Sequence, residues 1–346
     1  MQEFDLQIEL FHCATLPPQE GLRRWEELLS AVPLEDFSYR AKRLLPQVAQ
    51  NLGVEHPIVA EECERALSHN RMLESACCQV VTVLEARGID VIVLKGVVLN
   101  RSTHKSLGVR PAHDFDLLVR FEQASQAQQI LLEDGWQPWG DWVEPEERLE
   151  NAMEFKRDGA KLDLHWFLLR EARWNGCDVV FWESRSAFHL DGHEMSSLSL
   201  THQLFHLVAV AHREPHHLAR YLYDIEIFLR RHHAEIDFEE IERLLTERHL
   251  LQRLHNLPLR DLGWSCLRPQ HPASLFDRAW STVTRHRHDL VGEIGFAFFP
   301  LFDYWLHYRE SEWGLKRYLV RRLELQGFRD FLGRLWRKIW RWGPSS

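Results

Sequence analysis

Two aspartates stand two positions apart in "RPAHDFDLLV", residues 110–119, at the start of an otherwise apolar run. Side chains alternate across a strand, so Asp114 and Asp116 are expected to point to the same face of a sheet. Two carboxylates that close repel each other unless a cation lies between them. Mg²⁺ held by one or two carboxylates and by substrate phosphates is the commonest arrangement of this kind. The simpler alternative is an exposed strand end with two hydrated aspartates.

A third acid, Asp163, lies in "KLDLHW" between two leucines that must face the other side of the sheet. A carboxylate among apolar neighbours needs a metal ion or another cation as its partner. Three acids on neighbouring strands would hold two Mg²⁺ ions, the arrangement used in phosphoryl and nucleotidyl transfer. His165 stands two positions after Asp163, where it would either orient that carboxylate or be satisfied by a neighbour on the sheet.

Three further residues are candidates for binding phosphate. Lys95 and Gly96 in "VLKGVVL" end a predicted strand and begin a helix. A glycine there lets backbone N–H groups approach phosphate oxygens, and the lysine adds a positive charge. Arg110, four residues before Asp114, could bind a triphosphate through two parallel hydrogen bonds. The alternatives are a turn lysine, a glycine that only permits the bend, and a hydrated loop arginine.

The hydrophobic pattern predicts a small mixed α/β unit between two helical regions. Apolar residues recur every three or four positions over about 20–87 and again beyond about 196, which indicates helices. Between them, "IDVIVL" (89–94) and residues 114–119 are predicted strands, "EQASQAQQILLEDG" is a predicted helix, and Asp158-Gly159 joins two alternating runs as a hairpin. We therefore predict an α+β fold with three parts: an N-terminal helical region (1–75), a core with a small mixed sheet (76–195) and a C-terminal helical region (196–346).

The composition of the whole chain narrows the classes of function. The 346 residues carry a net charge of −9, so general binding to a nucleic-acid backbone is not expected. Six scattered cysteines without C-x-x-C spacing indicate reduced thiols in the cytoplasm. The start "MQEFDLQIEL" lacks the pattern of a signal peptide, and the apolar stretch at 290–306 is interrupted by Glu293, Pro300 and Asp303. That stretch is predicted to be a core helix and not a membrane span.

Two other stretches have a distinctive composition. In the histidine-rich stretch 202–217, His202 and His206 share a helix face as a zinc pair would, but His212 falls on another face. Packing, or a place for a few histidines in the acceptor cleft, is therefore favoured over a zinc site. The basic, aromatic tail "FRDFLGRLWRKIWRW", residues 328–342, would suit a membrane surface, and packing of its apolar side on other helices is favoured over that contact.

The motifs in their order along the chain resemble a known family. "VLKG", "RPAHDFDLLV", a helix ending in "LLEDGW", "KLDLHW", "HQLFHLVAVAHRE" and "LYDIEIFLRR" are similar to the largely uncharacterised nucleotidyltransferase family of the DNA polymerase β-like superfamily, over roughly residues 20–235. The resemblance implies a nucleotidyltransferase fold that uses Mg²⁺-NTP, with Asp114 and Asp116 as metal ligands and Asp163 as the third acid. The superfamily usually has a Gly-Ser pair close before its acids, whereas here Lys95-Gly96 stands further from Asp114.

The leading hypothesis is a metal-dependent nucleotidyltransferase. It would move a nucleoside monophosphate from an NTP such as ATP to an unidentified hydroxyl or phosphate acceptor, which is a small molecule, a peptide or a protein. Pyrophosphate would be released, with Asp114, Asp116 and Asp163 holding two Mg²⁺ ions. Lys95, Gly96 and Arg110 would position the triphosphate. The alternatives are a nucleotide-sensing or partner-binding protein with the same fold and no turnover, and a helical scaffold.

Overall fold

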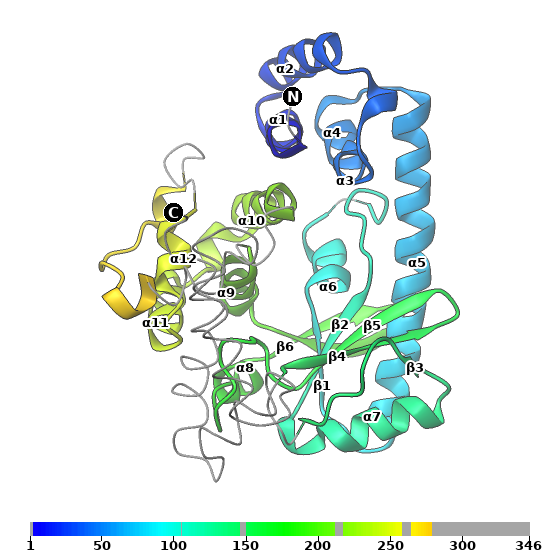
Figure 1. Cartoon of the computed structure of the whole chain (residues 1–346), viewed down its shortest axis with the longest axis vertical. Coiled ribbons are helices and arrows are strands. Elements are labelled where there is room, and N and C mark those ends of the chain that lie inside the picture. Colours follow the sequence, from blue (N-terminus) through cyan, green and yellow to red (C-terminus); the bar gives the residue numbers. More distant parts are fainter. Residues whose placement is uncertain (1–2, 105, 146–149, 212–216, 258–263, 279–346) are drawn as a thin grey trace, which may run out of the picture. The chain divides into compact units, whose positions relative to one another are not determined.

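The computed structural model describes residues 3–104, 106–145, 150–211, 217–257 and 264–278 (Figure 1). The chain divides into two compact units, one formed by residues 1–168 and 178–241 and the other by residues 169–177 and 242–346. All predicted site residues belong to the first unit. The apolar stretch 290–306, His212 and the tail 328–342 lie outside the described residues.

A seven-stranded mixed sheet forms the centre of the first unit and confirms the predicted α+β fold, with strands in the order β3-β4-β5-β2-β1-β7-β6. The strands are β1 (Val91–Leu94), β2 (Phe115–Val119), β3 (Gln137–Pro138), β4 (Ala152–Arg157), β5 (Ala160–His165), β6 (Ser186–Leu190) and β7 (His193–Ser197). Strand β1 is antiparallel to β2 and parallel to β7, while β2 is parallel to β5. Because β2 and β5 are neighbours, the two predicted acidic strands lie side by side.

Both predicted strands and the predicted hairpin are present, with β1 and β2 slightly shorter than expected. At the β4–β5 turn, Asp158 and Gly159 have φ values of 49° and 86°, as a two-residue type I′ turn requires. A second turn of the same kind joins β6 to β7 at Asp191 and Gly192, with φ values of 49° and 83°. The sequence reading did not predict this hairpin, because β6 is largely exposed and shows no clear alternation.

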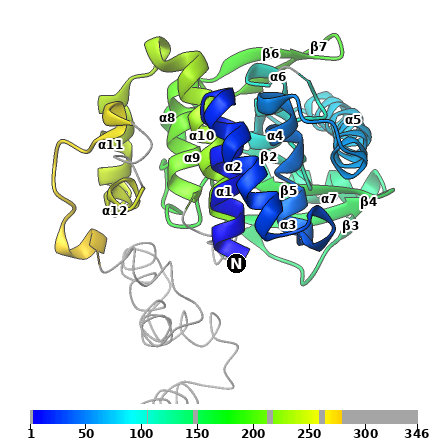
Figure 2. The same ribbon diagram turned by 90° about the horizontal axis from the view of Figure 1, so that it is seen from above.

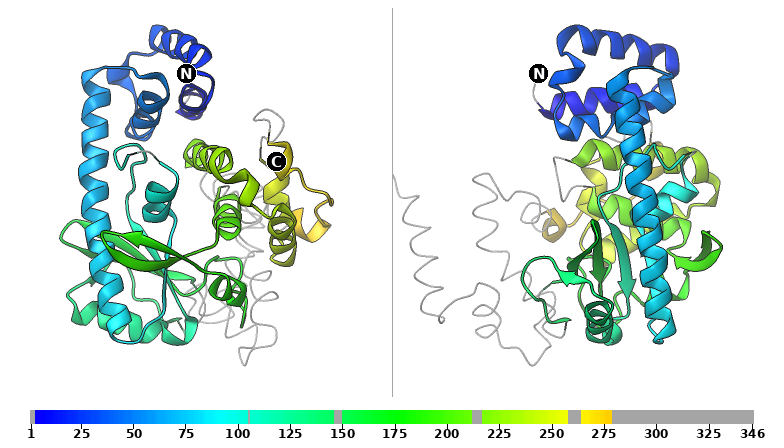
Figure 3. Two further views of the ribbon diagram at one scale, coloured as in Figure 1. Left: turned by 180° about the vertical axis from the view of Figure 1, so that it is seen from behind. Right: turned by 90° about the vertical axis from the view of Figure 1, so that its right-hand side faces the viewer.

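A 30-residue helix, α5 (Pro57–Ala86), runs along the sheet and contacts β1, β2 and β5 (Figure 3). His56 caps its start by accepting a hydrogen bond from the Ile58 backbone N–H through Nδ1. Its buried face includes Leu73, Val80 and Leu84, which follow the predicted helical spacing. The helix passes through residue 75 without interruption, so the predicted domain boundary there falls within one helix.

Helices from both ends of the unit pack together beside the sheet. Helix α1 (Glu3–Thr15) contacts α2 (Pro18–Ala31), α3 (Tyr39–Lys42), α4 (Leu45–Leu52) and α10 (Leu218–His232), and α10 contacts α9 (Leu200–Val210) (Figure 2). The remaining helices of this unit are α6 (Lys95–Ser102), α7 (Ala124–Glu133) and α8 (Val179–Glu183). Segments more than 170 residues apart in the sequence therefore meet in the first unit.

The second unit contains the end of α11 (Phe238–Glu247) and α12 (Leu251–His255). Within it, Arg253 donates through Nη2 to Glu171 Oε1 at 2.5 Å, and both side chains are buried. Among the helices that the structure describes, none has both the length and the apolar character needed to cross a bilayer.

Candidate functional site

A row of acidic side chains crosses three adjacent strands of the sheet, β2, β5 and β4, beside Leu94 on β1. Leu94 is paired with Asp116, Asp116 with Asp163, and Asp163 with Glu154. Residues that are directly paired point to the same face of a sheet, so the three acids line one face. Lys95 follows Leu94 at the start of α6 and stands beside this row. The parallel register of β2 and β5 is what brings Asp116 and Asp163 together.

Asp116 is the best-enclosed acid of the row, with only 4% of its surface exposed. Its Oδ1 accepts hydrogen bonds from Lys95 Nζ at 2.9 Å and from His165 Nε2, which lies 3.2 Å away. Burial alone would raise the pKa of Asp116, but the Lys95 charge and the His165 hydrogen bond hold it well below its ordinary value. Asp116 is therefore ionised at any physiological pH.

Of the two alternatives for His165, orienting Asp163 or being satisfied by a neighbour on the sheet, the hydrogen bonds fit the second, with Asp116 and Asn151 as the neighbours. The Asn151 Nδ2 amide lies 3.1 Å from His165 Nδ1 and can only donate, which leaves the ring hydrogen on Nε2, facing Asp116. A ring nitrogen that donates a hydrogen bond cannot at the same time bind a metal ion. His165 therefore fits a residue that orients the Asp116 carboxylate.

The pKa values of Asp163 and Asp114 are raised, whereas that of Asp116 is lowered. Burial, followed by the charges of Asp116 and Asp114, raises the pKa of Asp163 to about 8. Burial and the Asp116 charge also raise the pKa of Asp114, which lies just before β2. Carboxylates that raise each other's pKa in this way favour a bound cation.

The donor atoms of the row fit a divalent cation. One ligand atom from each of Asp116, Asp163 and His165 lies within 4.8 Å of the other two. Within the described part of the chain, this is the cluster whose spacing could hold a metal ion. Two carboxylate oxygens are hard ligands of the type that Mg²⁺ prefers. Asp114 is not in this group, although its charge acts on Asp163, so its role as a metal ligand stays a prediction.

The three predicted phosphate-binding residues lie next to one another. Lys95 has a φ of 40°, an uncommon value for a residue other than glycine, and such strain is often found at functional sites. A Cβ added to Gly96 would lie 3.5 Å from Arg110 Nη1 and 3.6 Å from the Asp114 carbonyl oxygen. The start of α6 thus faces the segment that carries Arg110 and Asp114.

Arg110 is fully buried, not a hydrated loop residue. Its Nε and Nη2 donate to the two carboxylate oxygens of Asp224 on α10, each at 2.8 Å. Burial would lower the pKa of Arg110, but the Asp224 charge raises it above its ordinary value. Only Nη1, which has no hydrogen-bond partner among the described residues, faces Gly96 and would be available to a phosphate.

The segment before β2 is held in place by residues that the sequence reading did not identify. Asn70 on α5 donates through Nδ2 to the Arg110 and Leu107 carbonyl oxygens, and its Oδ1 accepts from the Ala112 N–H. Asn70 is 1% exposed. The sequence signal for Asn70 is a polar residue on the apolar face of a predicted helix. The signal for the partner of Arg110 is Asp224, an acid within the apolar run "LYDIEIF".

The two histidines of α9 are both buried. His202 Nδ1 lies 2.8 Å from Ser184 Oγ, and the ring contacts Phe181 edge to face. His206 is 2% exposed. No group of metal-ligand geometry includes either histidine in the part of the chain that the structure describes.

Replacing His165 by leucine is expected to weaken divalent-metal binding about 10- to 100-fold, because leucine has no donor and Asp116 loses the hydrogen bond that orients it. Titration of Mn²⁺ into the full chain, followed by electron paramagnetic resonance, measures the affinity. His189→Leu on β6, where the side chain is 70% exposed, is the matched control and should bind Mn²⁺ as the wild type does. Equal affinities in the wild type and His165→Leu would show that His165 does not orient the metal ligand.

The pKa of Asp163 predicts how stability depends on pH in EDTA. A carboxyl with a pKa near 8 when folded and near 3.8 when unfolded keeps its proton in the native state between those values. The native state then binds more protons, so this group lowers the free energy of unfolding as pH rises from about 4 to about 8. Urea unfolding across that range should show that the free energy of unfolding falls less with rising pH in Asp163→Asn than in the wild type. Asp158→Asn, in the exposed hairpin turn, should follow the wild type; parallel curves for all three proteins would contradict the prediction.

Comparison with known proteins supports the family suggested by the motifs. The family model described as "Uncharacterised nucleotidyltransferase" matches residues 23–259. A search of curated proteins found no match. Among solved structures, the chain is similar to an antigenic nucleotidyltransferase-like protein from Paracoccidioides brasiliensis, with 14% identity and a TM-score of 0.35 over 58% of this chain and 92% of that one. With the matched region spanning most of its length, the chain belongs to this family of uncharacterised nucleotidyltransferases.

Proposed function

We propose that the protein transfers a nucleoside monophosphate from Mg²⁺-NTP to a hydroxyl or phosphate acceptor and releases pyrophosphate. The observation that carries the proposal is the pair of carboxylates on adjacent parallel strands, Asp116 and Asp163, with Lys95 at the start of α6 beside them. Membership of the nucleotidyltransferase family supports a general role in nucleotidyl transfer. The acceptor, the nucleotide and the number of metal ions belong to the proposal.

The proposal gives each residue of the row a role. Asp116 and Asp163 would hold the metal ions, with Asp114 next to them, and His165 would keep the Asp116 carboxylate oriented. When bound, Mg²⁺ would neutralise charge on the triphosphate and the leaving pyrophosphate and activate the acceptor oxygen. Lys95, the backbone at Gly96 and the remaining N–H group of Arg110 would bind phosphate oxygens.

The electrostatics of the row support metal binding in particular. Lys95 supplies one positive charge, and that charge is held at Asp116, where it forms an ion pair at 2.9 Å. It does not offset the burial and the neighbouring carboxylates that raise the pKa of Asp163. A divalent cation would let both Asp163 and Asp116 be ionised in the same small space.

Transfer of the nucleotide itself is the test. The full chain is incubated with Mg²⁺, a cell extract and NTPs labelled either at the α-phosphate or at the γ-phosphate. The proposal predicts that the α-label becomes covalently attached to an acceptor while the γ-label appears in pyrophosphate. Attachment of the γ-label would instead indicate a kinase, and Mg²⁺-dependent NTP binding without attachment of either label would favour the nucleotide-sensing alternative.

A further inference from the structure

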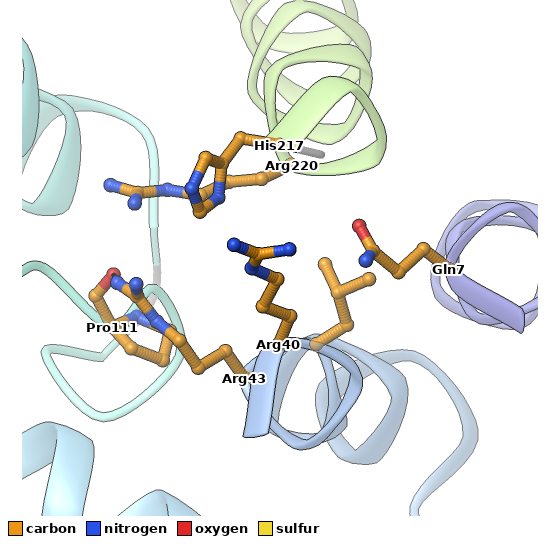
Figure 4. Close-up of a pocket in the computed structure, with 7 residues that line it drawn as sticks. Gln7, Arg40, Arg43, Pro111, His217 and Arg220 are labelled. Atoms are coloured by element: carbon orange, nitrogen blue, oxygen red, sulfur yellow. Dashed lines mark hydrogen bonds between the residues drawn. The ribbon is translucent and has the colours of Figure 1, made fainter. Parts of the chain in front are cut away.

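A pocket lined by basic side chains lies in the first unit, between the N-terminal helices, α10 and the segment before β2 (Figure 4). It is lined by Gln7, Arg40, Arg43, Leu44, Pro111, His217 and Arg220. Among the described residues, three arginines and a histidine contribute to it, and no carboxylate does. The hollow measures about 320 Å³, including space on its open side. Its composition points to an anionic ligand.

The arginines of this pocket keep hydrogen-bonding capacity that the described residues do not use. Arg43, 6% exposed, donates through Nη2 to the Pro111 carbonyl oxygen at 2.9 Å, which is a neutral partner. Arg220 has a buried Nε with no hydrogen-bond partner among the described residues. Arg40 is exposed and forms no hydrogen bond or ion pair with a described residue. Buried cationic groups usually have charged partners, so these groups are arranged for a ligand.

Repulsion among the arginines supports this interpretation. Burial, and then the charge of Arg220, lowers the pKa of Arg43 to about 9. Burial and the Arg110 charge also lower the pKa of Arg220. Two nearby carboxylates offset part of this repulsion: Asp114 acts on both arginines, and Asp224, which acts on Arg220, is already bonded to Arg110 through both of its oxygens. An anion placed between Arg43 and Arg220 would relieve the repulsion without breaking an existing ion pair.

We infer that this pocket binds a phosphate group of one of the substrates. Guanidinium groups hold phosphate oxygens through paired hydrogen bonds, and several arginines together match a group with more than one negative charge. Pro111, which lines the pocket, stands three residues before Asp114 in the segment that leads into β2, and the charge of Arg220 acts on Asp114. The ligand's identity as a substrate rests on the proposed nucleotidyl transfer. Its phosphate would come either from the NTP tail or from a phosphorylated acceptor.

Calorimetric titration of the full chain tests the pocket without metal. Inorganic tripolyphosphate and orthophosphate are titrated in EDTA at constant ionic strength set with chloride. Arg40→Gln removes an exposed charge that contacts no described residue, and Arg220→Gln removes the buried one. We expect about a fivefold loss of anion affinity in Arg40→Gln and about a tenfold loss in Arg220→Gln. Arg23→Gln, at a side chain that is 60% exposed on α2, is the control and should match the wild type.

Titration of Mg²⁺-ATP into the same proteins separates the two sources of phosphate. If the affinity for Mg²⁺-ATP falls together with that for tripolyphosphate, the pocket binds the NTP tail. If only orthophosphate binding falls, the pocket binds a phosphorylated acceptor. The inference is overturned if the wild type binds neither anion, or if both variants bind both anions within twofold of the wild type.

The carboxylate variant keeps this test independent of the proposed function. Asp116→Asn should not weaken tripolyphosphate binding in EDTA, because Asp116 does not line the pocket and the substitution removes none of its arginines. If the wild type shows no metal-dependent transfer but its anion binding depends on Arg40 and Arg220, the proposed reaction is rejected and the anion site is kept. If the wild type transfers nucleotide and both arginine variants bind the anions as the wild type does, the anion site is rejected and the proposed reaction is kept.

Discussion

Replacing Asp116 by asparagine is expected to lower nucleotide transfer by about 10³-fold, the scale of losing a main electrostatic group of an active site. The substitution keeps the shape of the side chain and removes the one carboxylate that bonds both Lys95 and His165. Metal-dependent NTP binding should fall as well, because Asp116 stays ionised at any physiological pH and its charge would be lost. Pyrophosphate release and calorimetric titration with Mg²⁺-NTP measure the two effects.

The change in stability should be much smaller than the change in activity. Asp116→Asn leaves Lys95 without its ion-pair partner, but Asp163 is close enough to interact with that charge and to lose its own proton more easily. Asp158→Asn makes the same chemical change in the β4–β5 turn, where the side chain is 94% exposed and φ is 49°, a value that asparagine accepts. The control should keep full activity. A folded Asp116→Asn protein with transfer within tenfold of the wild type would contradict the assignment.

Replacing Arg110 by methionine is expected to lower the free energy of unfolding by about 3–5 kcal/mol, because it leaves Asp224 as a buried charge without its partner. Arg110 and Asp224 expose 2% and 0% of their side chains and share two hydrogen bonds of 2.8 Å. Urea unfolding at pH 7 measures the loss. If Arg110 were mainly a phosphate ligand, the variant would bind NTP less well and unfold like the wild type.

A double substitution distinguishes a broken ion pair from damaged packing. Arg110→Met with Asp224→Leu removes both charges and should recover most of the lost stability, since buried pairs are often replaceable by apolar groups. Arg87 and Glu133 form an exposed pair at 3.3 Å, and Arg87→Met should cost less than about 1 kcal/mol. A double variant no more stable than Arg110→Met alone would show that packing around Arg110 is what matters.

Local patterns were enough to predict the elements that carry the acids. The β-branched run before Lys95, the alternation around Asp163 and the turn at Asp158 and Gly159 depend on nearest neighbours, and all appear in the structure. The same turn signal at Asp191 and Gly192 was overlooked because the strand before it is mostly exposed. Strand order was not predictable locally, because the pairing of β2 with β5 depends on what the intervening helix permits.

The roles of individual site residues depended on contacts that are distant in sequence. Arg110 was predicted to bind a triphosphate, yet two of its nitrogen atoms bond Asp224, which stands 114 positions later. His165 was linked to Asp163 because both lie on one strand, but it reaches Asp116 on the neighbouring strand. The arginine pocket combines α3 and α10, so no single motif contains it. Residue types and spacing identified the acids, and only the fold showed what surrounds them.

The most direct test of the central claim, that Asp116 and Asp163 form a metal centre for NTP, is the anomalous scattering of Mn²⁺ in crystals grown with a non-hydrolysable NTP analogue. We predict a peak at coordination distance from carboxylate oxygens of both Asp116 and Asp163, in contact with the triphosphate. The peak should be absent from crystals of Asp116→Asn grown in the same way. A bound analogue with no Mn²⁺ peak between these two carboxylates would contradict the account.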